Sequence, residues 1–75
     1  MIKGPKILIT FDSIHDVLST EKKLIAEMIP CDVVPTPRHL SADCGMSIEC
    51  NAADRERLEH LHAAGDIVWR ACNDS

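Results

Sequence analysis

Extended and helical segments follow one another in the order strand, helix, strand, and this order occurs twice along the chain. In the first half, the apolar and β-branched run at 6–11 predicts a strand. Ser13 is a typical helix N-cap, and Asp16 holds the capping-box position three residues later. The helix that follows has to end at Pro30, because proline has no amide hydrogen to donate. Its predicted apolar positions, which recur at helical spacing, are Ile14, Val17, Leu18, Leu24, Ile25 and Met28.

The strand predicted at 31–36 contains Pro35, which favours a place at the edge of a sheet, where a missing N–H is tolerated. In the second half, the alternation of apolar and polar residues at 46–50 is typical of a half-buried strand. Asn51 is a suitable N-cap for a second helix, and Gly65 is suited to end that helix in the left-handed conformation. The buried positions expected on the second helix are Leu58, Leu61 and Ala64.

A last strand is predicted at 66–72, with Ile67, Trp69 and Ala71 on one face. The resulting order, βαββαβ, predicts an α+β fold of the ferredoxin-like type. In this fold a four-stranded antiparallel sheet, in the spatial order 4-1-3-2, carries both helices on one face. The 75 residues are enough for one small domain spanning 1–75.

The charge of the chain excludes some classes of partner. Eight Lys and Arg residues face twelve Asp and Glu residues, a formal charge of -4. An acidic protein repels phosphate backbones, so nucleic acid is not an expected partner.

The longest apolar run is about four residues, too short for a membrane span, and the first residues lack the apolar region of a signal peptide. We therefore expect a cytoplasmic protein with its four cysteines reduced.

The predicted topology separates the cysteines into two groups. The exit of the first strand, the start of the first helix and the loop at 38–45 share one end of the molecule, which places Cys44 near Asp12, Ser13 and His15. No CxxC or HxxxH pair exists, and a zinc site built from all four cysteines is disfavoured. We expect no metal and no cofactor. The cysteines expected at the opposite end are Cys31, Cys50 and Cys72.

Cys44 is the candidate reactive thiol, because it lies in a loop and is followed by Gly45. The thiolate is the reactive form, so the pKa of Cys44 matters. Arg38 and His39 in the same loop would lower this pKa, as would the positive end of the first helix, whereas the nearby aspartates would raise it. The structural alternative is a small buried cysteine that anchors the loop.

The remaining cysteines are better interpreted as core residues. If Pro35 pairs with Met46, Cys31 falls directly opposite Cys50 on the neighbouring strand. Side chains at directly opposed positions are close, so we expect two reduced thiols in packing contact. Cys72, at the end of the last predicted strand, is expected to be half exposed.

The histidines have both a chemical and a structural interpretation. His15 and His39 would approach Cys44 from two directions and form a Cys–His pair, or they are solvated residues at an end rich in loops. His60 and His62 lie two residues apart on a helix and therefore point about 200° apart. These two cannot share a metal ion and are expected at the surface.

The stretch PTPRHLSADCG, from Pro35 to Gly45, resembles a family of small bacterial proteins described as selenium/sulfur carrier-like. Members of that family have this length and begin with a strand that ends in phenylalanine, followed by a serine and a helix, as at 11–16 here. A PTPR segment, a serine three residues before a Cys-Gly pair and an apolar strand come next. The matching positions in this chain are Pro35, Thr36, Pro37, Arg38, Ser41, Cys44 and Gly45.

The resemblance implies a carrier that is not itself an enzyme. Cys44 would hold sulfur as a persulfide, or selenium as the analogous selenosulfide, between a donor and an acceptor enzyme. Arg38 would favour the anionic sulfur, and Ser41 and the amide of Gly45 would donate hydrogen bonds to it.

Two further interpretations stay open. The first is a non-catalytic interaction or regulatory module that forms a homodimer through the open face of the sheet. The second is a thiol redox switch, which would need a second cysteine near Cys44 that the predicted topology does not provide. An enzyme is not expected, since there are no paired carboxylates at a defined pocket, no phosphate-binding glycine-rich loop and no nucleophile elbow. The predicted open face carries Leu8, Thr10, Ser47, Glu49, Val68 and Arg70.

Overall fold

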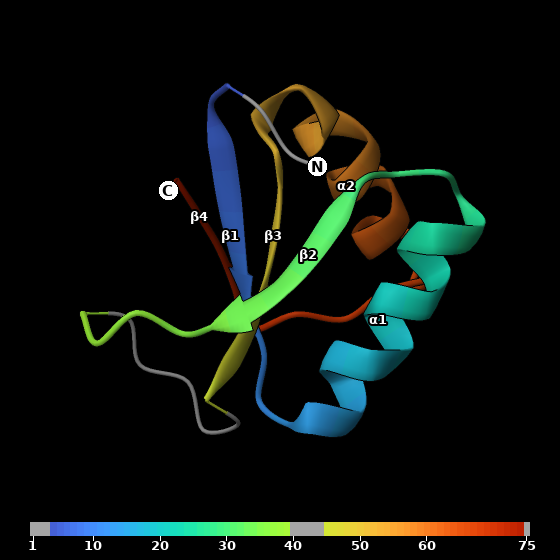
Figure 1. The fold of residues 1–75 in the computed structure, drawn as a ribbon. Coiled ribbons are helices and arrows are strands. Elements are labelled where there is room, and N and C mark those ends of the chain that lie inside the picture. Colours follow the sequence, from blue (N-terminus) through green and yellow to red (C-terminus); the bar gives the residue numbers. More distant parts are fainter. Residues whose placement is uncertain (1–3, 40–44, 75) are drawn as a thin grey trace.

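The computed structural model describes residues 4–39 and 45–74, and predictions that fall on residues 1–3, 40–44 or 75 lie outside it. Strands and helices follow one another in the predicted order (Figure 1). Their bounds are β1 (Lys6–Thr10), α1 (Ile14–Ala26), β2 (Cys31–Pro35), β3 (Met46–Asn51), a short 3-10 helix (Ala52–Asp54), α2 (Arg55–Ala63) and β4 (Ala71–Asp74).

The strands form one antiparallel sheet in the order β2-β3-β1-β4, and both helices cover the same face of it (Figure 1). This is the predicted arrangement, so the ferredoxin-like α+β fold is confirmed. β2 is an edge strand, which agrees with the proline at its end.

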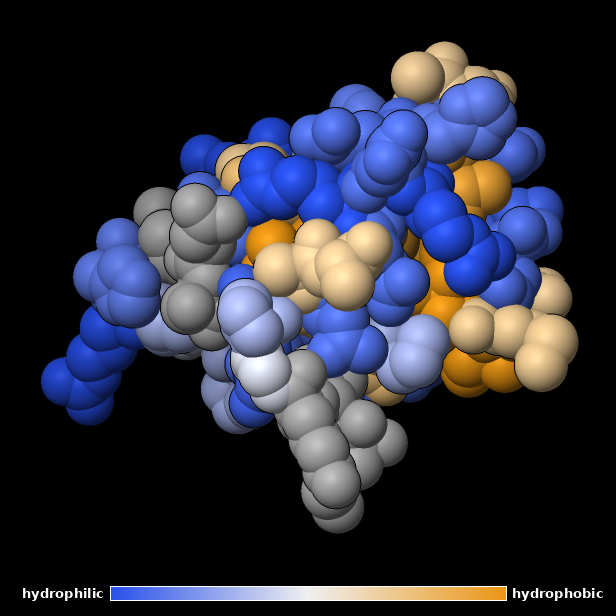
Figure 2. All heavy atoms as spheres, turned by 90° about the horizontal axis from the view of Figure 1, so that it is seen from above, coloured by the Kyte–Doolittle hydropathy of each residue, from blue (hydrophilic) through white to orange (hydrophobic). Residues whose placement is uncertain are grey.

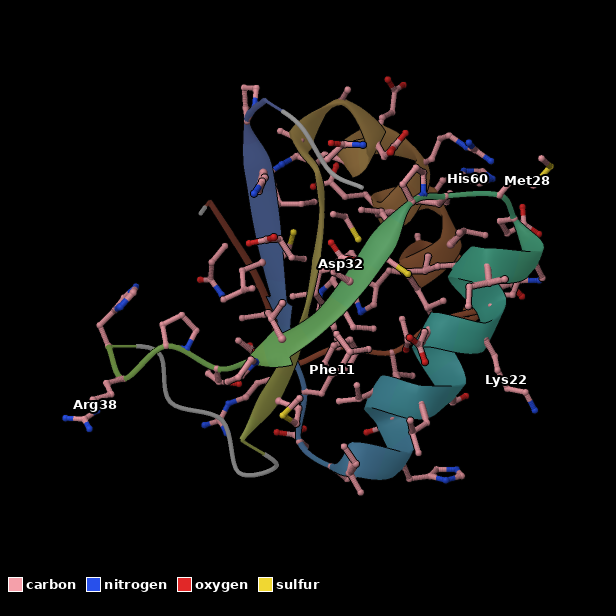
Figure 3. All side chains as sticks on the ribbon, in the orientation of Figure 1. Phe11, Lys22, Met28, Asp32, Arg38 and His60 are labelled. Atoms are coloured by element: carbon pink, nitrogen blue, oxygen red, sulfur yellow. The ribbon has the colours of Figure 1, made fainter. Side chains whose placement is uncertain are left out.

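The core lies between the sheet and the two helices. Alternate residues of the central strands, Ile7 and Ile9 on β1 and Ile48 and Cys50 on β3, point toward the helices and are fully buried. Phe11, just after β1, is also fully buried and lies between the sheet and α1 (Figure 3). The helices contribute Val17, Leu24, Leu58 and Leu61 to the same cluster.

The start of α1 is fixed as predicted. The side chain of Ser13 accepts a hydrogen bond from the backbone amide of Asp16 at 3.2 Å, which satisfies one of the amides that have no partner within the helix. At the other end, α1 stops at Ala26, ahead of Pro30.

The predicted apolar face of α1 is only partly correct. Val17, Thr20 and Leu24 are buried, at the spacing of residues that lie on one face of a helix. The other predicted positions form a second stripe, rotated by about 100° from the first, and this stripe faces outward. Its exposed side chains are Ile14 (50%), Leu18 (53%), Ile25 (62%) and, just beyond the helix, Met28 (86%).

The second helix begins later than expected. Asn51 belongs to β3, where it pairs with Lys6, and the amide of Ala52 donates to the carbonyl of Pro5 at 2.9 Å. Because this pairing holds Asn51 in the strand, its side chain makes no capping hydrogen bond, contrary to the prediction. Gly65 follows α2 with φ 82°, as expected for a left-handed helix end.

The last strand is shorter and shifted compared with the prediction. β4 begins at Ala71, and Ile67 and Trp69 lie in the irregular segment before it. Ala71 pairs with Thr10 and therefore lies on the open face of the sheet, whereas the predicted strand placed it with Ile67. Val68 and Arg70 precede the strand and so do not occupy sheet positions on the open face. The apolar alternation that suggested a longer strand reflects core packing of Ile67.

The open face of the sheet presents little apolar surface among the described residues. Leu8, Thr10 and Ser47 point to this face and are 3%, 2% and 0% exposed. Figure 2 views the molecule from above, not onto the open face, and shows a mostly hydrophilic surface whose larger apolar area lies at the right. The structure contains no helix, within its described part, that is long and apolar enough to cross a membrane.

Candidate functional site at the β2–β3 loop

The loop that contains the Pro-Thr-Pro-Arg segment is closed at its base by hydrogen bonds. The amide of Thr36 donates to the carbonyl of Gly45 at 2.9 Å, one position beyond the pairing of Pro35 with Met46. The hydroxyl groups of Thr36 and Ser47 lie 2.6 Å apart and share a hydrogen bond. The two ends of the loop are therefore attached to the end of the sheet. Sequence reasoning missed the Thr36–Ser47 contact, although the correctly predicted register would have brought these hydroxyls together.

Gly45 is required by its backbone conformation. Its φ is 73°, in the left-handed region that residues with a side chain rarely adopt. A Cβ atom placed there would have no neighbour within 4 Å, so close approach of another chain segment is not the reason for glycine.

The predicted site residues are only partly within the described structure. Arg38 and His39 are exposed in the loop, and the side chain of Arg38 points away from the body of the molecule (Figure 3). His15 is exposed near the start of α1. Ser41 and Cys44 lie outside the described residues, so their predicted roles stay predictions.

The described loop ends lie at the end of the molecule that the topology predicted. Thr10, the last residue of β1, pairs with Ser47, next to the loop. The start of α1 follows β1 directly at this end (Figure 1). The side chains of Asp12 and Arg70 approach each other to 3.6 Å and join the exit of β1 to the entry of β4. The arginine therefore offsets part of the negative charge that Asp12 brings to this end.

Two of the sheet thiols have pKa values that disfavour reaction. Cys50 is fully buried, and burial, followed by the charge of Cys31, raises its pKa to about 12. Cys31 is partly buried, and burial, followed by the charges of Glu21 and Asp32, raises its pKa as well. Because the thiolate is the nucleophile, both groups are poorly reactive at neutral pH.

The third sheet cysteine does not lie where the topology prediction placed it. Cys31 and Cys50 are directly opposed, as predicted, at the end of the sheet away from the loop. Cys72 instead pairs with Ile9, one position below the end of the sheet that carries the loop. The cause is the shifted start of β4, which moves Cys72 to the middle of its strand and onto the core face.

The histidines of α2 are exposed, as expected. The ring of His62 stacks on Trp69 with a centroid distance of 4.0 Å and an angle of 4° between the planes. This contact holds the segment before β4 against α2 and was not predicted. Within residues 4–39 and 45–74, no group of three or more His, Cys, Asp or Glu side chains could hold a metal ion.

A half-open hollow of about 370 Å³ lies at the opposite end of the molecule from the loop, between the end of α1 and α2. The side chain of Arg57 donates to the carbonyl of Glu27 there at 3.0 Å. The hollow is lined by Glu27, Ala53, Glu56, Arg57, His60 and Leu61.

Comparison with known protein families identifies the chain. The family described as "Putative Se/S carrier protein-like" matches residues 6–72, from β1 through Cys72 in β4. The chain belongs to this family. The carrier-like family was predicted from the segment between Pro35 and Gly45, and the match extends over nearly all of the sheet and both helices. No curated protein and no solved structure matches the chain.

Proposed function

We propose that this protein carries sulfur or selenium on the thiol of Cys44, between a donor and an acceptor enzyme. In the sulfur reaction, the Cys44 thiolate attacks the outer sulfur of a persulfide on the donor. An S–S bond forms at Cys44, the S–S bond of the donor breaks, and the donor leaves as a thiol. One sulfur atom moves with no net oxidation, so the carrier needs no cofactor. Family membership over 6–72 supports a carrier rather than an enzyme.

The observation that carries the choice of Cys44 is the environment of the sheet thiols. The pKa of Cys50 is about 12, and that of Cys31 is also raised. A group with such a pKa is almost entirely protonated at neutral pH and attacks a persulfide slowly. The loop thiol is therefore a better candidate for the carrying group than Cys31 or Cys50.

The surroundings of the loop support the roles assigned to its neighbours. Arg38 is exposed in the loop, where its guanidinium group would meet an anionic sulfur during transfer. Ser41 and the amide of Gly45 would donate hydrogen bonds to that sulfur. His15 and His39 are exposed and would accept the thiol proton. A reducing cytoplasm would keep the thiol ready for the next transfer.

Sulfur loading tests this proposal. The protein is incubated with a cysteine desulfurase and cysteine, and its intact mass is measured without reductant. We expect a gain of one sulfur atom in the wild type and in Cys72→Ser, and no gain in Cys44→Ser. Loading of Cys44→Ser to the wild-type level would exclude Cys44 as the carrying thiol.

The alternative, a homodimer through the open face of the sheet, has less support. Leu8, Thr10 and Ser47 on that face are already buried within one chain, so covering the face gains little apolar area. Sedimentation equilibrium tests this alternative. A protein that is monomeric and still loads sulfur does not need the interface through the open face.

A further inference from the structure

Cys31 and Cys50 face each other across the two strands of one hairpin, formed by the edge strand β2 and the central strand β3. Cys31 is the first residue of β2, and Cys50 lies opposite it near the end of β3. Both thiols are free, and both belong to the face of the sheet that packs on the helices. The hairpin that they close at its base is the one whose turn contains the candidate carrier loop.

The hydrogen-bond pattern of the hairpin tells how close the two cysteines lie. The bond from Thr36 to Gly45 makes that pair a hydrogen-bonded one. Since hydrogen-bonded and non-hydrogen-bonded pairs alternate along antiparallel strands, the pair five positions away, Cys31 and Cys50, is non-hydrogen-bonded. The pairing of β3 with β1 leads to the same assignment. The bond from Ala52 to Pro5 makes the pair of Ile7 and Cys50 a hydrogen-bonded one, so the backbone groups of Cys50 point toward β1 and not toward β2.

The non-hydrogen-bonded pairing of Cys31 and Cys50 has a direct consequence for disulfide formation. In a non-hydrogen-bonded pair the Cα atoms lie about 4.5 Å apart, closer than in the alternative pair. Disulfides join residues whose Cα atoms are about 4.4–6.8 Å apart. The backbone therefore already lies within the permitted range, and the sulfur atoms can meet by rotation of the two side chains.

We propose that Cys31 and Cys50 form a reversible cross-strand disulfide that closes the base of the β2–β3 hairpin under oxidising conditions. The bond would link the two strands at the end of the hairpin opposite to the loop at 36–45. It is a modification site of the sheet and does not depend on the carrier proposal for Cys44.

The oxidant required is a low-molecular-weight disulfide. Cys31 is half-buried, whereas Cys50 is fully buried, so the thiolate of Cys31 attacks first. Its sulfur bonds to one sulfur of the reagent, and one reagent thiol leaves. The thiolate of Cys50 then attacks the Cys31 sulfur, and the second reagent thiol leaves. The protein loses two hydrogens and two electrons, and the reagent gains both as two thiols.

The raised pKa values of both cysteines affect the rate of this reaction. Only a small fraction of either thiol is ionised at neutral pH, so the bridge forms slowly there. The rate should rise with pH, because each step needs a thiolate. The pair would therefore respond to sustained oxidation and would not compete with a faster thiol.

Cys72 provides a matched control. It lies on β4, and β1 separates β4 from β3. Two strand spacings amount to about 9–10 Å, which exceeds the reach of a disulfide. A bridge between Cys50 and Cys72 therefore requires the sheet to open.

The test uses the full chain with Cys44→Ser, so that the carrier thiol cannot take part. The variant is incubated with oxidised glutathione under native conditions, and tryptic peptides are analysed without reduction. Cleavage after Lys23, Arg38, Arg55 and Arg70 places the three remaining cysteines in separate peptides. We expect a Cys31–Cys50 peptide pair, its loss on reduction, and an increased urea midpoint of the bridged protein.

Two companion variants make the outcome decisive. Adding Cys72→Ser should leave the bridge and its rate unchanged, and adding Cys31→Ser should abolish it. A glutathione adduct on Cys31 that never resolves into a bridge would overturn the proposal. So would a bridge that includes Cys72 in a protein whose circular dichroism remains native. Failure of Cys44 to load sulfur would leave this result unaffected, so the two proposals can fail separately.

Discussion

The described cysteines differ because each occupies a different position in the sheet. Cys50 lies on a central strand and faces the helices, so water cannot solvate its thiolate. Cys31, on the edge strand, is partly buried, and the negative charges of Glu21 and Asp32 raise its pKa further. Burial and nearby negative charge both favour the protonated form. The position of these two thiols in the sheet is therefore enough to keep them protonated.

The pKa of Cys50 predicts a pH dependence of stability. The native pKa is about 12, raised from 9.0, so the unfolded chain loses this proton first. The stabilisation is fully present below pH 9.0 and is lost as the pH rises toward about 12. We expect the free energy of unfolding in urea to fall over this range in the wild type. The fall should be smaller in Cys50→Val, which keeps the shape but cannot ionise; equal falls in both proteins would contradict the assignment.

Single residues were predictable where one local rule acted alone. Ser13 caps α1 as expected, because its partner amide lies three residues away in the sequence. The opposition of Cys31 and Cys50 followed from pairing Pro35 with Met46. The position of Cys72 was not predictable in the same way, because it depends on where a distant strand, β1, begins to pair with β4.

The helix α1 has two apolar stripes, and only one of them packs on the sheet. Val17 and Leu24 are fully buried, whereas Leu18 and Ile25 are 53% and 62% exposed. A periodic pattern in the sequence cannot distinguish the two stripes, since both recur at helical spacing. Contacts with the sheet decide which stripe is buried.

This division predicts opposite results for neighbouring residues. Leu24→Ala leaves a cavity in the core and should lower the free energy of unfolding by about 2–5 kcal/mol. Ile25→Ala removes an exposed side chain and should change it by less than about 0.5 kcal/mol. Urea denaturation of both variants checks the prediction. Similar losses in the two variants would mean that the outer stripe is covered in solution.

The boundaries of α2 and β4 were harder to predict, because tertiary contacts override the local signals there. Asn51 has the preference of a helix cap, but its pairing with Lys6 keeps it in β3. The run before Ala71 alternates like a strand, yet the hydroxyl of Thr20 donates to the carbonyl of Val68 at 3.3 Å and ties this segment to α1. Both errors concern element ends, where a few hydrogen bonds decide the outcome.

At the scale of the whole molecule, the topology separates the loop from the most deeply buried thiol. The loop base, the end of β1 and the start of α1 share one end of the sheet, and Cys31 and Cys50 lie toward the other. This separation could be predicted from the order of the elements alone. It agrees with the proposal that the sheet stays intact while the loop takes part in transfer.

Competitive alkylation of the wild-type protein tests the proposed division most directly. The native protein is treated with a limiting amount of iodoacetamide at neutral pH, and each of the four cysteines is quantified by peptide fragmentation. In a denatured control the four should react at similar rates. In the native protein, we expect Cys44 to be modified well before Cys31, Cys50 and Cys72. Modification of Cys31 or Cys50 as fast as Cys44, or no modification of Cys44, would contradict the account.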